Sequence, residues 1–370
     1  MTEYTHYIPV ETLQAFTEDV LIKLQVPPDD AKACAEVIIA SDLRGIESHG
    51  IGRLRYYYVR IKSGQHQVIT KPESIRESPT TAVIDGHHGM GMVIAKQAMQ
   101  LAIDKARQYG MGSVAVRNST HFGIAGYYPL MAVNQGMIGL TFTNSRPSVA
   151  PTFGTQPILG TNPIAFGAPT DEPFPFLYDA ATPIIQRGKV ETLAREEKPA
   201  EVGWLVNSQN EYLTDPNRIL DSLLKGDAAF LPLGGAGEAM GGHKGYGLGT
   251  MVEILSASLQ NGVFLSALTG MAENGSPKPF RVGHFFMAIN IESFTSLDEF
   301  KMTTGKILRE LRASRKAPGQ PRIYTAGEKE YEKEIEVRAK GVPVIPNLQK
   351  DLLFMKEELG LEEYQFPFDS

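Results

Sequence analysis

Apolar residues recur at helical spacing along the first sixty residues of the chain. This period predicts three helices, over 10–26, about 29–43 and 51–61. Pro27 and Pro28 end the first helix, and Asp29 or Asp30 can cap the second. The N-terminal region should therefore be helical.

Beyond Lys71 short apolar runs alternate with longer helical patterns. We expect strands or short apolar elements at 81–85, 112–116, 138–143, 163–168, 174–178, 204–206 and 284–294. Further helices are expected at 93–108, 127–134, 246–259, 298–313, 328–340 and 348–359. This mixed order indicates an α/β or α+β fold. The segment 144–162 is rich in proline, glycine and threonine, and functional sites often lie in such loops.

Composition narrows the class of protein. The 370 residues carry a formal net charge of −6, which does not favour nucleic acid or an anionic membrane as a partner. The single cysteine, Cys34, excludes a disulfide within one chain. No apolar run approaches the roughly 20 residues of a membrane span, and residues 1–7 show no apolar core of a signal peptide. We expect a soluble cytoplasmic protein.

Two segments, 47–53 and 119–123, place a histidine within two residues of a glycine. His49 lies four residues before Arg53, one turn away if a helix begins at Gly50. A base and a cation at this spacing suit an anionic substrate that loses or gains a proton. His121 follows the strand expected at 112–116, and its spacing alone leaves open whether it belongs to a site.

Two glycine-rich stretches invite a nucleotide interpretation. Residues 89–95 follow an expected strand and open a helix, but the next strand ends without the acid that a dinucleotide fingerprint requires. A tight turn into a packed helix is the simpler interpretation. Residues 234–245 do not form a P-loop, because Gly245 follows Lys244. Exposed backbone N–H groups beside Lys244 at a helix start still suit a pyrophosphate, although a flexible loop fits equally well.

The eight histidines are scattered without the spacing of metal ligands, so no metal site is expected.

Six motifs together resemble the malate/L-lactate dehydrogenase type 2 family. They occur in family order over nearly the whole chain, at 42–50, 118–123, 160–163, 179–182, 241–247 and 317–319. The resemblance implies a mixed α/β fold distinct from the Rossmann fold, with a helical N-terminal region and a mixed-sheet cofactor-binding domain. It also implies NAD- or NADP-dependent hydride transfer between nicotinamide and a 2-hydroxy or 2-oxo acid.

Malate and oxaloacetate are the preferred substrates under this resemblance. The alternatives are lactate, sulfolactate or ureidoglycolate dehydrogenase, or a cyclic-imine or diketo-acid reductase. Imine-reducing members have an aspartate near the position of Lys189, so this chain is more similar to the hydroxy-acid members. A nucleotide-binding protein without catalysis is the interpretation outside enzymes. The sequence does not distinguish NAD from NADP.

Carried over by position, the resemblance assigns His49 or His121 as the proton donor and acceptor, with preference for His49 and with Ser48 orienting it. Arg53 would bind the substrate carboxylate. Tyr57 and Asn162 are further substrate-side candidates. The implied cofactor contacts are Ser145, Asp179, Ala180, Ala181, His243, Lys244, Gly327, Glu328 and Lys329.

The resemblance also implies an organisation for the chain. Residues 1–75 would form a helical region that packs with C-terminal helices in 296–370. Residues 76–145 and 230–295 would form the mixed-sheet cofactor domain, and 146–229 a further substrate and cofactor lobe. The expected partners are a small-molecule substrate and a second copy of the chain in a homodimer.

Overall fold

The computed structural model describes residues 5–369. Residues 1–4, part of the segment 1–7 in which no signal peptide is expected, lie outside the described residues. The described helices are α1 (Val10–Lys23), α2 (Pro28–Leu43), α3 (Leu54–Lys62), α4 (Gly91–Tyr109), α5 (Tyr127–Val133), α6 (Arg187–Arg195), α7 (Pro216–Lys225), α8 (Gly242–Ala257), α9 (Leu297–Ala313), α10 (Glu328–Lys340) and α11 (Pro346–Leu359). No helix among the described residues is long and apolar enough to cross a membrane.

The strands are β1 (His6–Ile8), β2 (Glu73–Glu77), β3 (Thr81–Asp85), β4 (Met111–Ser119), β5 (Met137–Thr143), β6 (Ile164–Ala168), β7 (Phe176–Ala180), β8 (Leu205–Asn207), β9 (Ala228–Phe230), β10 (Val282–Asn290) and β11 (Val342–Val344). Seven of them form one sheet in the order β2-β3-β4-β10-β5-β6-β7. Only the pair β3 and β4 is parallel, joined through α4; the other neighbours are antiparallel. The expectation of a mixed sheet is confirmed.

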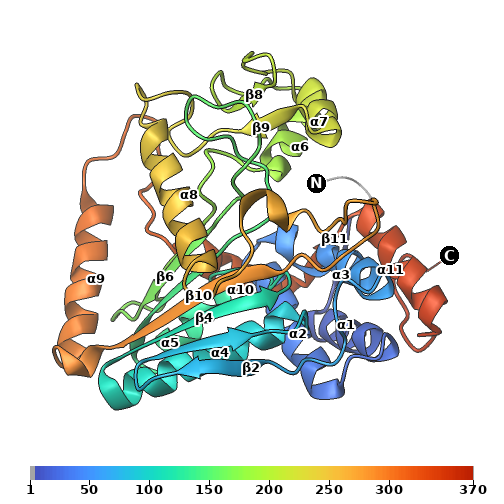
Figure 1. Ribbon diagram of the computed structural model, residues 1–370. Coiled ribbons are helices and arrows are strands. Elements are labelled where there is room, and N and C mark those ends of the chain that lie inside the picture. Colours follow the sequence, from blue (N-terminus) through green and yellow to red (C-terminus); the bar gives the residue numbers. More distant parts are fainter. Residues whose placement is uncertain (1–4, 370) are drawn as a thin grey trace.

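Helices cover both faces of this sheet (Figure 1). On one face, α4 and α5 bury alanine, methionine and isoleucine side chains against β3, β4 and β10. On the other, Val252 of α8 packs against Phe142 and Phe285. The strand residues of β4 alternate between these two cores, because successive side chains point to opposite faces.

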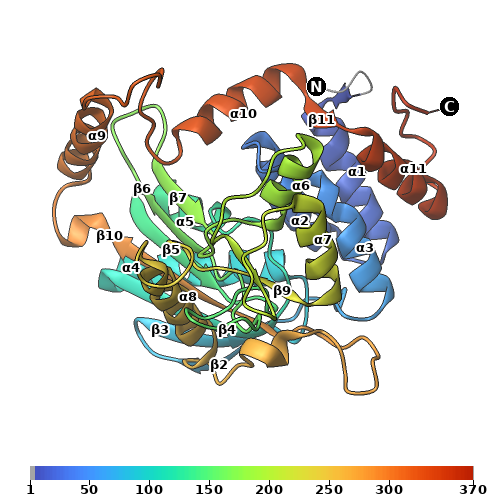
Figure 2. The ribbon, with the colours of Figure 1, turned by 90° about the horizontal axis from the view of Figure 1, so that it is seen from above.

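A second core joins the two ends of the chain. α1, α2 and α3 pack with β11 and α11, and β1 pairs with β11. In Figures 1 and 2, α1, α3 and α11 lie together at one side of the molecule, whereas α9 lies at the opposite side. The C-terminal region 296–370 therefore does not pack with the N-terminal helices as a whole, because α9 is separated from them.

A smaller unit contains α6, α7 and the pair β8 and β9 around its own apolar core (Figure 1). β6 and β7 do not belong to it, although 146–229 was expected to form one lobe. Their hydrogen bonds extend the central sheet from β5.

Most expected elements are found within a few residues of their predicted bounds. One prediction about a helix start was wrong: α2 begins at Pro28, with Pro27 at the cap position, rather than after a cap by Asp29 or Asp30. Proline suits the first helical turn because that turn has no internal acceptor for its N–H. Asp29 and Asp30 lie within this first turn, where the helix dipole favours negative charge.

Candidate active site

Two short 3₁₀ turns, Glu47–His49 and Ile51–Arg53, connect α2 to α3. Asp42, at the end of α2 and 3% exposed, accepts a hydrogen bond from the backbone N–H of Ile51 at 2.6 Å. A Cβ atom on Gly50 would lie 1.9 Å from the other carboxylate oxygen, so only glycine fits there. Burial raises the pKa of Asp42 to about 8. This carboxyl group thus holds the backbone on which His49 is carried.

His49 and Arg53 are held by Ser48 through different atoms. The Ser48 hydroxyl lies 2.9 Å from Nδ1 of His49. The Arg53 Nε donates to the Ser48 backbone carbonyl at 2.6 Å. Because this contact uses only Nε, the two terminal nitrogens of Arg53 remain available for a carboxylate.

His121 reaches the same place from the loop after β4. Its ring stacks on that of His49, with the centroids 5.5 Å apart and the planes inclined by 21°. Gly91, at the start of α4, lets this loop pack closely, since a Cβ there would lie 2.3 Å from the Thr120 carbonyl oxygen. The Gly91 N–H also donates to the Thr120 hydroxyl at 2.8 Å. The glycines at 89–91 therefore serve a packed turn that supports the His121 loop, as the simpler interpretation expected.

Both histidines are held neutral near pH 7. Burial, followed by the charge of Arg53, lowers the pKa of His49 from 6.5 to about 4. Burial also holds the pKa of His121 well below its usual range, and His49 and Arg53 add to this effect. Two neutral imidazoles beside an arginine can exchange a proton with an anionic ligand and bind its carboxylate.

The structure brings Tyr57, a predicted substrate contact, to this cluster. Tyr57 is fully buried, and its hydroxyl lies 2.6 Å from Nδ1 of His121. This contact supports the His121 ring, and the substrate contact expected for Tyr57 stays a prediction.

Asn162 is not brought to the histidines. It is fully buried, and its amide nitrogen bonds to the Gly249 carbonyl at 2.9 Å and to Glu253 at 2.8 Å. Glu253, on α8, also accepts from the side chain of Asn144 at 3.3 Å. The carboxylate and the carbonyl occupy its donors, whereas its Oδ1 has no partner among the described residues, and its expected substrate role stays a prediction. Its position ties the 144–162 loop to α8.

Ser145 lies at the base of the same loop. Its hydroxyl accepts from the Thr161 N–H at 2.9 Å. The Thr161 carbonyl in turn accepts from the N–H of Thr182, directly after Ala181. Thr161 therefore connects Ser145 to the end of β7, where Ala180 and Ala181 lie.

Asp179 on β7 faces α5 and α10. Its carboxylate accepts from the Gly126 N–H at 2.6 Å. Burial raises its pKa to about 6; the Gly126 bond opposes this, and Glu330 adds to it. The positive charge of Arg44, at the end of α2, lowers the pKa of Asp179.

The candidates at the start of α10 lie near the other end of β7, where the Leu177 N–H bonds to the Ala326 carbonyl at 3.2 Å. Gly327 is buried there, and a Cβ on it would lie 2.7 Å from the Pro175 carbonyl oxygen. Glu328, 5% exposed, is bound by Arg322 and by the Thr325 N–H. Lys329 lies over the ring of Tyr324. These contacts occupy Glu328 and leave only Lys329 exposed for a ligand.

His243 and Lys244 begin α8, a helix of 16 residues. Both side chains are exposed, and neither has a hydrogen-bond or ion-pair partner within residues 5–369. The preceding loop folds back on the helix start, so that a Cβ on Gly242 would lie 2.1 Å from the Gly235 carbonyl oxygen. The helix start thus offers backbone N–H groups and a free cation, which fits a pyrophosphate.

The family match covers residues 8–353 and is to the malate/L-lactate dehydrogenase family. The chain belongs to this family. A malate dehydrogenase of Pyrococcus abyssi is 46% identical over 356 residues, which is 96% of this chain and 95% of that one. The L-sulfolactate dehydrogenase of Methanocaldococcus jannaschii is 40% identical over 94% of this chain and 96% of its own length.

Solved structures of this dehydrogenase family share the fold. Malate dehydrogenase from Entamoeba histolytica superposes with a TM-score of 0.93, at 43% sequence identity, over 98% of this chain and all of that one. The expectation of a non-Rossmann malate/L-lactate dehydrogenase fold is therefore confirmed. Because the fold is not a Rossmann fold, the strand after residues 89–95 does not need the acidic residue of a dinucleotide fingerprint.

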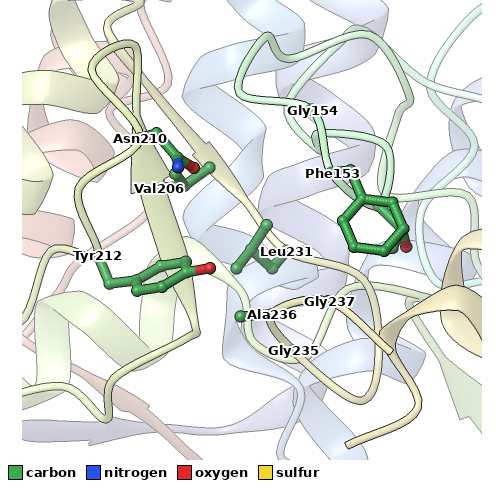
Figure 3. A pocket seen from close by; sticks show the side chains of 10 residues that line it. Phe153, Gly154, Val206, Asn210, Tyr212, Leu231, Gly235, Ala236 and Gly237 are labelled. Atoms are coloured by element: carbon green, nitrogen blue, oxygen red, sulfur yellow. The ribbon is translucent and has the colours of Figure 1, made fainter. Parts of the chain in front are cut away.

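A cavity of about 220 Å³ adjoins the glycine-rich loop of this family member. Figure 3 shows Tyr212 and Phe153 on opposite sides of it, with Leu231 between them and Gly235 to Gly237 along its edge. The same loop forms the cavity edge and contacts the start of α8.

Sequence reasoning assigned no role to two buried groups beside the histidines. Asp42 belongs to the 42–50 motif, and its spacing from Gly50 was the available signal. His66 is 2% exposed and packs near the rings of Tyr56 and Tyr57, and neither of its ring nitrogens has a partner in the described chain. No sequence pattern marked His66. Within residues 5–369 no cluster of His, Cys, Asp or Glu could hold a metal ion.

Proposed function

We propose that this protein transfers hydride between nicotinamide and a small 2-hydroxy or 2-oxo acid, with malate and oxaloacetate as the substrate pair. The observation that carries the proposal is the stacked pair of neutral histidines beside an arginine with free terminal nitrogens. Two relatives named malate dehydrogenase, 44% and 46% identical, support malate over sulfolactate, since the sulfolactate dehydrogenases are 35% and 40% identical.

Arg53 would bind the substrate carboxylate through its two terminal nitrogens, which match the two carboxylate oxygens. This contact would place C2 and its oxygen against the histidine pair. In the oxidation direction His49 or His121 accepts the hydroxyl proton, and each must be neutral to do so. When bound, the nicotinamide would supply the acceptor for the hydride at C2.

The exposed N-terminus of α8 suits the cofactor pyrophosphate, with Lys244 and His243 adding charge and donors. Ser145 and the strip from Asp179 to Ala181 are the further contacts in this proposal, with Gly327 to Lys329 at the far end of β7. Among the last group, Lys329 is the residue with a free charge. NAD and NADP are both retained as the cofactor.

We infer a homodimer as the working form. Exposed apolar side chains follow α8 and its C-terminal turn, where Ile254, Leu259 and Phe264 are 54%, 54% and 59% exposed. Ile254 and Phe264 line the same hollow, and an exposed apolar patch marks an interaction surface. Light scattering coupled to size exclusion should give twice the 40.6 kDa chain mass. The cytoplasm is the proposed location, in keeping with a single buried cysteine.

Loss of absorbance by reduced nicotinamide tests the proposed function. NADH and NADPH are each mixed with the protein and with oxaloacetate, pyruvate, sulfopyruvate or oxalurate in separate wells. We expect the fastest decay of absorbance with oxaloacetate. The rates with NADH and NADPH in the same experiment show which cofactor the protein prefers. Faster decay with another acid would move the assignment to that substrate. Absence of both decay and cofactor binding would contradict the dehydrogenase proposal.

A further inference from the structure

The hydrogen bond between Tyr57 and His121 has a direction. Tyr57 is fully buried on α3, and Nδ1 of His121 is the one hydrogen-bond acceptor for its hydroxyl among the described residues. Burial raises the pKa of Tyr57 well above 10, so the phenol keeps its proton. A buried hydroxyl normally donates to an available acceptor, which here is Nδ1.

The backbone N–H of Gly123 points to the same ring nitrogen, at 3.3 Å. A backbone N–H can only donate, so this contact favours a lone pair on Nδ1 of His121, and the same N–H also donates toward the Tyr57 oxygen. The Tyr57 hydroxyl and the Gly123 N–H therefore both favour an unprotonated Nδ1 on His121. A proton on Nδ1 would face the Gly123 N–H and leave the Tyr57 hydroxyl without an acceptor.

His49 is not constrained in this way. Its Nδ1 faces the Ser48 hydroxyl, which can either donate or accept. Neither Nε2 of His49 nor Nε2 of His121 is among the buried unpartnered atoms of the described chain, and neither makes a hydrogen bond there. Both atoms are therefore open to a ligand.

We propose that Tyr57, together with the Gly123 N–H, is a positioning residue that fixes neutral His121 with its proton on Nε2. This inference rests on the proposed function and assigns a different role to each histidine. His121 donates a hydrogen bond to the substrate oxygen. His49 presents the lone pair that takes the proton when the O–H bond breaks and hydride leaves C2 for nicotinamide. The products are a ketone, reduced nicotinamide and protonated His49.

The first test reads the tautomer directly in the free protein. Protein labelled with ¹⁵N-histidine is examined by long-range ¹H–¹⁵N correlation at pH 7, and His121 is assigned by the signal lost in His121→Asn. We expect a protonated Nε2 and an unprotonated Nδ1 in the wild type. A protonated Nδ1 would overturn the proposal. This reading needs no activity, so it remains decisive if the dehydrogenase proposal fails.

The second test uses Tyr57→Phe, with Tyr58→Phe as the matched control. Tyr58 lies on the same helix, is also buried, and bonds to Glu358 away from the histidines. In Tyr57→Phe we expect the His121 signals to shift toward a tautomer mixture. kcat for oxaloacetate reduction should fall roughly 5- to 100-fold, with KM changed less than about twofold. Tyr58→Phe should keep both constants and the His121 signals. A raised KM with unchanged kcat in Tyr57→Phe would make Tyr57 a substrate contact and contradict the proposal.

Discussion

At the scale of single residues, the site depends on environments that shift the chemistry of ordinary side chains. His49 and His121 come from segments 72 residues apart, yet their rings stack at 5.5 Å. Burial and the charge of Arg53 keep His49 neutral at pH values where a free histidine is half protonated. His49 is therefore neutral near pH 7, which is the form that the proposed base requires.

Removal of either imidazole should separate their roles. We expect His49→Ala to lower kcat for malate oxidation by about 10²–10⁴, the usual effect of losing a general base. His121→Ala should lower kcat as well, because the oxygen loses its hydrogen-bond donor. Steady-state kinetics of both variants measures this, with cofactor fluorescence as the control for binding. Wild-type kcat in His49→Ala would exclude it as the base.

The depressed pKa of His49 predicts the acid limb of the rate profile. Oxidation requires the neutral form, so kcat/KM for malate should stay level as the pH falls through 6.5 and decline only near about 4. The measurement is initial rate against pH, with unfolding monitored in parallel. An inflection near 6.5 would show that the base lies in a solvated environment, contrary to this structure.

The motifs predicted His49, Arg53 and His121 as site residues, because side-chain type and short spacing can be read from the sequence, and the structure brings the two histidine rings together. They did not reveal that the Tyr57 hydroxyl reaches His121, or that Asn162 is enclosed with Glu253. Both facts depend on how α3 and α8 pack against distant loops. Side-chain direction at such contacts is set by the tertiary structure.

At the scale of elements, helices were the most predictable part. The 3.6-residue period of an amphipathic helix is local, so α4, α9 and α10 were found close to their expected bounds. β1 and β11 have three residues each and pair across more than 330 positions. No local pattern predicts such a pair. α6, α7 and the edge strand β2 were likewise not predicted.

Gly50 connects element packing to the site. Gly50→Ala would place a methyl group 1.9 Å from the Asp42 carboxylate oxygen, so the loop that carries His49 must move. We expect a loss of about 1–3 kcal/mol in unfolding free energy and a lower kcat. Denaturant unfolding and kinetics measure the two effects.

Gly188→Ala is the matched control for that substitution. Gly188 lies in α6 with no heavy atom within 4 Å of the added Cβ, so alanine should stabilise the helix by about 0.5–1 kcal/mol. Activity should not change. Equal changes in unfolding free energy and kcat for the two substitutions would show that the close contact between Gly50 and Asp42 does not contribute to stability or activity.

At the scale of the whole molecule, two cores meet around the site. The core of the chain ends carries His49 and Arg53, and the central sheet carries His121. The division into a region 1–75, a sheet domain and a lobe 146–229 stays a prediction, with β6 and β7 joined to the sheet. The sequence could indicate the elements, but the assignment of 164–180 to the sheet depends on long-range pairing.

Buried neutral histidines make the fold sensitive to acid. The pKa values of His66 and His284 are lowered to about 3 by burial, and that of His49 to about 4. In the unfolded chain these groups bind protons near pH 6.5, so below that pH the unfolded state takes up more protons. These three histidines should lower the unfolding free energy from pH 6.5 to about 4, by up to about 1.4 kcal/mol per pH unit for each. Asp42 and Asp179, whose pKa values are raised to about 8 and about 6 in the folded chain, act in the opposite direction, so the net fall is smaller than the sum over the histidines. Urea titrations across this range measure the slope. Stability that rises on acidification would contradict the burial of these rings.

The proposed substrate site is tested most directly by kcat/KM for oxaloacetate in Arg53→Lys. The paired terminal nitrogens of Arg53 are the proposed partners of the substrate carboxylate. Lysine keeps the charge but cannot form two parallel hydrogen bonds. We predict a loss of roughly 10-fold or more, with cofactor affinity unchanged. Wild-type kcat/KM in Arg53→Lys would contradict the assignment of this cluster as the substrate site.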